Sequence, residues 1–162
     1  MLLRLSVIIG LLALTACGFT PMYGSSGHNA PKQLEQVDIA LIPNESGVYL
    51  RNLLIDNFYQ DGYPKSPAYT LSVANITEAK TDLDITIESD ATRKQITLTA
   101  VMVLVDSKTG QAVLSRNLRA LTSYNVLDSQ FTTRVSEQDA REAALADLAR
   151  QIENQVVLYL KR

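Results

Sequence analysis

The sequence has very few of the residues on which enzymes and metal centres most often depend. Its 162 residues include one histidine, one cysteine and no tryptophan. The histidine, His28, lies within residues 24–31, a stretch rich in glycine and serine that is typical of a flexible tether. Histidine-dependent catalysis needs a rigid scaffold, and zinc sites usually draw on several cysteine or histidine side chains. We therefore identify no catalytic residues and no metal site.

The sequence also lacks a marked excess of charge and a glycine-rich phosphate loop. Its formal net charge is −2 at pH 7, whereas nucleic-acid-binding domains usually carry a strongly basic face. The carboxylates of Asp82, Asp84 and Glu88 recur at even spacing, which is typical of the solvated face of a strand rather than of an acid–base pair. A non-enzymatic binding or assembly role, with no cofactor and no nucleic-acid partner, is favoured over a hydrolase.

The apolar run near the start of the chain, from Leu5 to Leu14, is too short to span a bilayer, which needs about 20 apolar residues. It follows a basic start with Arg4 and precedes small residues, the pattern of a secretory signal peptide. The lone Cys17 stands where such a signal is cut. An odd cysteine in an exported protein needs a partner or a chemical use.

Residues 14–17, Leu-Thr-Ala-Cys, resemble the lipobox of bacterial lipoproteins. This resemblance implies cleavage before Cys17, a diacylglycerol on its sulfur and an acyl chain on its new amino group; two or more chains anchor a protein stably. Gly18 in place of aspartate favours the outer membrane. The alternative is a chance cysteine near the end of an ordinary signal peptide. The predicted organisation is a signal peptide (1–16), a lipidated N-terminus and flexible tether (17–35) and a folded domain (36–162).

Hydrophobic periodicity predicts four strands and two helices in the folded domain. The predicted elements are a strand at 37–42, a helix at 49–59 capped by Asn44 or Ser46, an interrupted strand at 69–87, strands at 93–105 and 112–124, and a helix that begins at Ser136 with Asp139 in a capping box. Residues 75–81 break the alternation, which indicates a bulge or bend in one long strand, or a short loop. Residues 83–87 alternate as in a half-buried strand. Turns are predicted at 88–92 and 106–110.

These elements predict an α+β fold with two layers. Consecutive strands with short turns form an antiparallel meander, so we expect a mostly antiparallel four-stranded sheet in the order β-α-β-β-β-α. Two amphipathic helices then pack on one face of the sheet, and its other face meets water or a partner.

The apolar stripe of the last helix is formed by Leu145, Leu148, Ile152, Val156 and Tyr159. One face of the strand at 93–105 is lined by Ile96, Leu98, Ala100, Met102 and Leu104. Half of the strand at 93–105 is apolar on both faces, because it also carries Val101, Val103 and Val105. We therefore expect both faces of the sheet to be covered there, by this domain or by a partner.

Several basic residues lie on the predicted strands. Arg93 and Lys94 are adjacent, while Arg116 and Arg119 are an odd number of residues apart and are expected on opposite faces. Strand arginines and lysines are most often ordinary surface charges. An arginine fork beside a lysine on a rigid strand is also suited to gripping the phosphate groups of a lipid.

The residues directly after the cysteine, 18–24, read Gly-Phe-Thr-Pro-Met-Tyr-Gly. Together with Cys17 they form a Cys-Gly-Phe-x-Pro-x-Tyr-Gly opening that resembles a divergent branch of the LptE family of lipopolysaccharide-assembly lipoproteins. The likeness continues through residues 124–131 and the alanine-rich segment 140–146. The predicted order of elements also matches the fold of that family.

This resemblance implies a concrete function. LptE proteins plug the lumen of the outer-membrane barrel LptD in a one-to-one complex, and together they place lipopolysaccharide in the outer leaflet. It also implies a lipid-anchored protein of the outer membrane that faces the periplasm and enters the barrel lumen. Arg93 and Lys94 are the best local match to lipopolysaccharide-binding residues of the family. The alternative is an auxiliary lipoprotein of another envelope lipid transporter.

Overall fold

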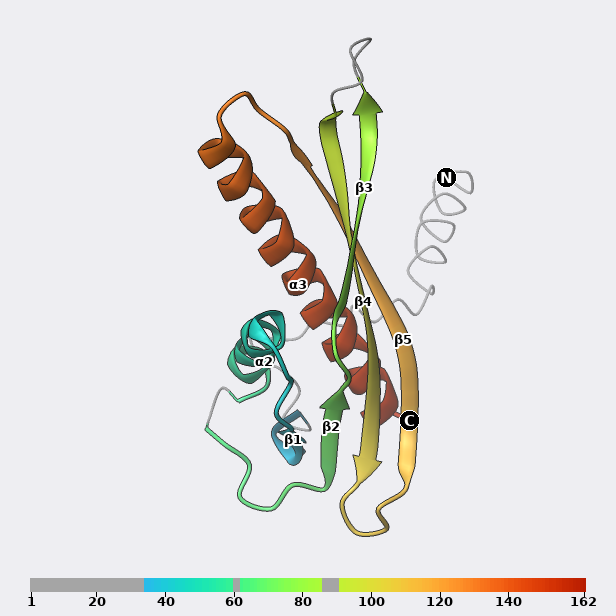
Figure 1. Cartoon of the computed structure of the whole chain (residues 1–162). Coiled ribbons are helices and arrows are strands. Elements are labelled where there is room, and N and C mark those ends of the chain that lie inside the picture. Colours follow the sequence, from blue (N-terminus) through green and yellow to red (C-terminus); the bar gives the residue numbers. More distant parts are fainter. Residues whose placement is uncertain (1–33, 60–61, 86–90) are drawn as a thin grey trace, which may run out of the picture.

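The computed structural model describes residues 34–59, 62–85 and 91–162 (Figure 1). The predicted signal peptide, Cys17, the tether up to residue 33 and most of the predicted turn at 88–92 lie outside these residues. The elements in chain order are η2 (Leu34–Gln36), β1 (Val37–Ile39), α2 (Glu45–Phe58), β2 (Tyr69–Val73), β3 (Thr77–Ile85), β4 (Ala91–Asp106), β5 (Ala112–Asn125) and α3 (Gln130–Leu160). Leu34 was predicted to lie in the tether, yet it is fully buried.

The α+β class and the two layers are confirmed. Helices α2 and α3 pack against each other, and α3 also packs along β4 and β5, so the helices form one layer over the sheet (Figure 1). The sheet has five strands in place of the expected four and is mixed, because β1 pairs with β2 in parallel. The other strand pairs are antiparallel.

The extra strand comes from the interrupted segment at 69–87. Strands β2 and β3 lie end to end along one edge of β4, which pairs with β5 along its other edge. Of the two interpretations of this segment, the short loop between two strands is right and the single bent strand is wrong, although the break covers only residues 74–76, and Thr77–Thr81 belong to β3. The backbone N–H of Ala74 donates to the carbonyl of Val101 at 2.9 Å, which carries the ladder into the break.

The core lies between the sheet and the two helices. Its sheet side is the predicted stripe of β4, and every member is buried: Ile96, Leu98, Ala100, Met102 and Leu104. Helix α3 contributes the predicted Leu145, Leu148, Ile152 and Val156, and α2 contributes Leu50, Leu54 and Phe58. Burying a leucine or phenylalanine side chain contributes about 1.5–3 kcal/mol, so this interface dominates the stability of the domain.

The strand predicted to include residues 83–87 is present as far as Ile85, but the expected burial of Leu83 is wrong, because the residue is 45% exposed. The preceding residues of the same parity, such as Ala79 and Thr81, pair with residues of β4 that point away from the helices. Leu83 itself lies in the register shift between Asp82 and Asp84. Ile87, the last residue of the predicted alternation, lies outside the described residues.

The predicted start of the C-terminal helix is also wrong. Helix α3 begins at Gln130, and the hydroxyl of Ser129 accepts from the backbone N–H of Thr132 at 3.5 Å. Ser136 therefore lies inside the helix and is not its cap. The hydroxyl of Thr133 donates to the carbonyl of Leu127 and accepts from its N–H, which fixes the entry of the chain into the first turn.

Helix α2 starts at Glu45, before the apolar residues that begin at Tyr49, and Asn44, one of the two predicted caps, lies at its N-cap position. Asn44 has a φ of 70° and its side chain makes no capping hydrogen bond. The predicted hairpin turn at 106–110 is confirmed. The Asp106 carboxylate accepts from the backbone N–H groups of Lys108 and Thr109 at 2.9 and 2.8 Å, and Gly110 supplies the positive φ. These bonds lower the pKa of Asp106, with the Thr109 amide contributing most.

Among the described residues, neither helix is long and apolar enough to cross a membrane.

Candidate functional site

One face of the sheet points away from the helices, and we call it the open face. Paired residues of antiparallel strands place their side chains on the same face, so the buried even-numbered residues of β4 assign its odd-numbered residues to the open face. On β4 these are Arg93, Gln95, Thr97, Thr99, Val101, Val103 and Val105, and their partners on β5 include Ser115, Asn117, Arg119, Leu121, Ser123 and Asn125.

The open face is mostly polar. Hydroxyl and amide side chains dominate it, with exposed apolar groups at Val101 and Leu121, which are 40% and 48% exposed. Its charged groups among the described side chains of β2 to β5 are Arg93 and Arg119. The side chain of Asp84, whose backbone pairs with Arg93, lies outside the described part. Asp38 of β1 stands opposite Thr70 at the far edge of the sheet.

The structure separates the two residues of the predicted Arg-Lys pair. The Arg93 guanidinium donates to the hydroxyl of Ser123 at 2.8 Å on the open face. Lys94 forms an ion pair with Asp82 at 3.3 Å and pairs with the buried Tyr124, which places it on the side of the helices. The two cations therefore do not form one cluster. The period-two rule that separates Arg116 from Arg119 applies equally to neighbours in a strand, and it would have shown this from the sequence.

Arg116 and Arg119 do lie on opposite faces, as predicted. The Arg116 side chain donates to the amide oxygen of Gln155 on α3 at 3.3 Å, so it lies on the helix side. Arg119 pairs with Thr99 on the open face. Its backbone carbonyl accepts from the amide of Gln151 at 3.0 Å, which covers part of the free edge of β5.

The helix side of the sheet carries a compact ion network between β3 and α3. Arg141 contacts Glu78 and Glu137, each at 2.7 Å, and Lys80 contacts Glu137 at 2.6 Å. Arg141 lowers the pKa of Glu78, and Lys80 lowers the pKa of Glu137, because each cation hydrogen-bonds the ionised carboxylate. The same bonds raise the pKa values of Lys80 and Arg141. Two cations thus balance two carboxylates, and the network holds the first half of α3 to the sheet.

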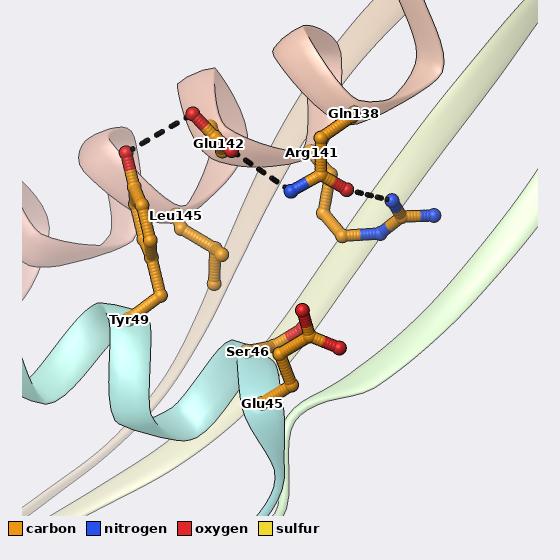
Figure 2. A pocket seen from close by; sticks show the side chains of 7 residues that line it. All are labelled: Glu45, Ser46, Tyr49, Gln138, Arg141, Glu142 and Leu145. Carbon is orange, nitrogen blue, oxygen red and sulfur yellow. Dashed lines mark hydrogen bonds between the residues drawn. The ribbon is translucent and has the colours of Figure 1, made fainter. Parts of the chain in front are cut away.

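A small pocket opens between α2 and α3, with a volume of ≈ 130 Å³ (Figure 2). Sites for organic ligands usually have about 300–1,000 Å³. Its polar side chains bond to one another: Gln138 donates to Glu142 at 2.8 Å, Arg141 donates to Gln138 at 2.8 Å, and Tyr49 donates to Glu142 at 3.3 Å (Figure 2). Burial together with Glu142 raises the pKa of the Tyr49 hydroxyl, so that group stays protonated. The pocket is part of the packing of α2 on α3.

Within the described ranges, no group of three or more histidine, cysteine, aspartate or glutamate residues is arranged to hold a metal ion. We take the open face as the candidate functional surface.

Comparison with protein families gives one match to this chain. The model of the family described as "LptE: Lipopolysaccharide-assembly" matches residues 34–156. No curated protein sequence matches.

Several solved structures share the fold. A putative lipoprotein from Caulobacter crescentus CB15 has a TM-score of 0.63 at 21% identity, over 83% of this chain and 98% of that one. A minor lipoprotein from Acinetobacter baumannii has a TM-score of 0.56 at 22% identity, over 75% of this chain and 90% of that one. An uncharacterized lipoprotein B from Nitrosomonas europaea has a TM-score of 0.60 at 15% identity, over 77% and 83% of the two chains.

Proposed function

The chain belongs to the LptE family of lipopolysaccharide-assembly proteins, and we propose from this membership that it is an outer-membrane lipoprotein that plugs an LptD-type β-barrel. In this role it supports the assembly of the barrel and the insertion of lipopolysaccharide at the cell surface. The partner is one barrel for each lipoprotein.

The observation that carries this proposal is the extent of the family match. Residues 34–156 run from η2 into the last turns of α3, so the match covers both layers of the fold and not one motif. The open face adds support, because a plug needs an outward surface that tolerates a wet, polar wall. Hydroxyl and amide groups make such contacts directly or through water.

Membrane attachment rests on Cys17. We propose that it carries the S-diacylglycerol and the N-acyl chain implied by the lipobox at residues 14–17. A tether from Cys17 to Leu34 then separates the anchor from the folded domain, which lets the domain enter the barrel while the acyl chains stay in the bilayer.

Binding of lipopolysaccharide through Arg93 and Lys94 also remains a proposal. Because the two side chains are separated, this binding would not use one shared site. Arg93 on the open face and Lys94 beside Asp82 would each make their own contact with a phosphate, since they do not meet at one point.

The test is affinity purification of the full-length, lipidated protein from outer membranes. We expect a large β-barrel to co-purify at a one-to-one ratio. Recovery of the intact lipoprotein without a barrel would contradict the proposal, and recovery with inner-membrane transporter subunits would favour the role of an auxiliary lipoprotein in another envelope lipid transporter.

A further inference from the structure

Helix α3 is buried unevenly along its length. Its buried residues begin at Ala140 and end at Val157, so residues 130–139, all of which the structure describes, contribute none of them. We call residues 130–139 the arm. Helix α2 lies beside the later part of α3, where Asn57 donates to Glu153 at 3.3 Å, and the first turns of α3 extend beyond α2 (Figure 1). The arm therefore lies outside the apolar packing that holds the rest of the helix.

The contacts that hold the arm to the sheet are polar, and Glu137 is at their centre. Its carboxylate accepts from Lys80 of β3 at 2.6 Å and from the hydroxyl of Tyr124 of β5 at 3.3 Å. Arg141, just beyond the arm, contacts Glu78 and Glu137 at 2.7 Å each. The Lys80 side chain is 43% exposed, and ion pairs in contact with solvent add little to stability. A segment held in this way opens at a lower free-energy cost than a packed core.

The start of the arm is fixed to the loop that precedes it. The Thr133 hydroxyl accepts from the N–H of Leu127 at 2.9 Å and donates to its carbonyl at 3.0 Å, and the Ser129 hydroxyl caps the first turn. These bonds lie within the arm and its loop, so they are kept when the arm leaves the sheet. We therefore expect the arm and the loop to move together, rather than to fray residue by residue from the helix end.

Buried side chains of the sheet lie beneath the end of the arm. Ile96 of β4 is fully buried and pairs with Thr122, whose hydroxyl donates to the carbonyl of Ala140 at 2.8 Å. Tyr124, two residues further along the same face of β5, is 7% exposed and bonds to Glu137. The end of the arm therefore covers Ile96 and Tyr124, and it is held over them by polar bonds.

We propose that the arm is a movable strap that separates from the sheet as a unit while residues 140–157 stay docked, and that Glu137 is its latch. Opening of the arm exposes Ile96 and Tyr124 and creates an apolar slot between α3 and the sheet. The inference concerns the domain itself and does not depend on the proposed barrel partner.

The first test is the reactivity of a buried thiol in the full-length, lipidated protein in detergent micelles. Ile96→Cys places a thiol under the arm. Ala100→Cys is the control, because Ala100 is 2% exposed on the same face of β4 but lies at the level of Gln151, whose amide bonds to Arg119. We expect N-ethylmaleimide to modify the thiol under the arm at least about tenfold faster than the control thiol. Mass spectrometry of the peptide that carries each thiol measures the rates, and equal rates or a faster control would overturn the proposal.

The second test addresses the latch. Glu137→Gln removes its ion pairs, and Arg150→Gln is the matched control, because it removes an exposed ion pair of the same helix, with Asp147 at 3.0 Å. We expect Glu137→Gln to raise the reaction rate of the thiol under the arm about fivefold and to leave the control thiol unchanged, as loss of ion pairs confined to the arm would do. Arg150→Gln should change neither rate. An unchanged rate under the arm, or an equal rise at both thiols, would overturn the proposal.

Thr122→Cys gives the same measurement without a substitution in the core, should Ile96→Cys fail to fold. Thr122 is partly buried, and its hydroxyl bonds to the helix at the end of the arm. Glu137→Gln should again raise the reaction rate about fivefold. A rate that does not rise would show that the arm is not latched by Glu137, and the proposal would be wrong.

Discussion

At the scale of single residues, Gly47 shows how closely the segment before α2 packs against that helix. A Cβ atom built on Gly47 would lie 2.7 Å from Cγ2 and 2.8 Å from the carbonyl oxygen of Ile42. The carbonyl belongs to the backbone and has little freedom to move. We expect Gly47→Ala to lower the free energy of unfolding by about 1–3 kcal/mol, a typical cost of overpacking.

Urea unfolding measures this change. Asn52→Ala on the exposed side of α2 is the control, and its stability should stay the same or rise slightly because alanine favours helix. If Gly47→Ala were as stable as Asn52→Ala, the close packing of Ile42 on α2 would be wrong.

The ion network between β3 and α3 makes stability depend on pH. The pKa values of Glu78 and Glu137 are lowered from 4.5 by Arg141 and Lys80, respectively, so both carboxylates stabilise the fold above pH 4.5. That contribution is lost as the pH falls from 4.5 through their lower pKa values in the folded state. Solvent screens the network, so the loss is about 1 kcal/mol or less.

We therefore expect Glu137→Gln to make the urea midpoint vary less between pH 5 and about pH 3 than it does in the parent protein. A plot of the urea midpoint against pH should have a shallower slope for the variant. The curves of the variant and the parent should converge at low pH. A variant with the parent's full pH dependence would show that the network does not stabilise α3.

At the scale of elements, α3 is held by its apolar stripe. Leu148 is fully buried in that stripe, whereas Leu158 on the same helix is 53% exposed. We expect Leu148→Ala to cost about 2–5 kcal/mol, the range for a leucine removed from a core. Leu158→Ala should cost less than about 1 kcal/mol, as surface substitutions do. Thermal unfolding of the two variants provides the comparison. Similar losses of stability in both would mean that Leu148 does not lie in the buried stripe of α3.

The sequence predicts elements well where one local pattern is long and uninterrupted. The β4 stripe from Ile96 to Leu104 alternates without a break, so its face and its burial are both confirmed. The start of α3 fails because Ser136 has the local signature of a cap. No glycine or proline lies between Gln130 and Ser136, and the helix continues through them.

Pairings between distant segments were harder to predict. The parallel contact of β1 with β2 joins Val37 to Tyr69 across an intervening helix, and no local pattern specifies it. The exposure of Leu83 likewise follows from the pairing of β3 with β4, which sets the face of each β3 residue. Of the candidate site, the free face of the sheet is predicted from amphipathic helices on one side. The separation of Arg93 from Lys94 also follows from the period of two along a strand, and the strand register confirms it.

At the scale of the whole molecule, we propose that a lipid anchor on Cys17 acts together with the folded domain. We expect Cys17→Ser to abolish incorporation of labelled palmitate and to release the protein from the membrane fraction, because hydroxyl oxygen does not replace the thiol that receives the diacylglycerol. Metabolic labelling followed by fractionation measures both. Retention of label in the variant would exclude Cys17 as the lipidated residue.

Membership of the family supports a role in lipopolysaccharide assembly, and the proposed activity is the delivery of lipopolysaccharide to the cell surface. The most direct measurement is the arrival of newly made, pulse-labelled lipopolysaccharide at the surface while the lipoprotein is depleted. The account predicts that arrival falls as the lipoprotein disappears and recovers when the intact chain is supplied again. Unchanged delivery after complete depletion would contradict it.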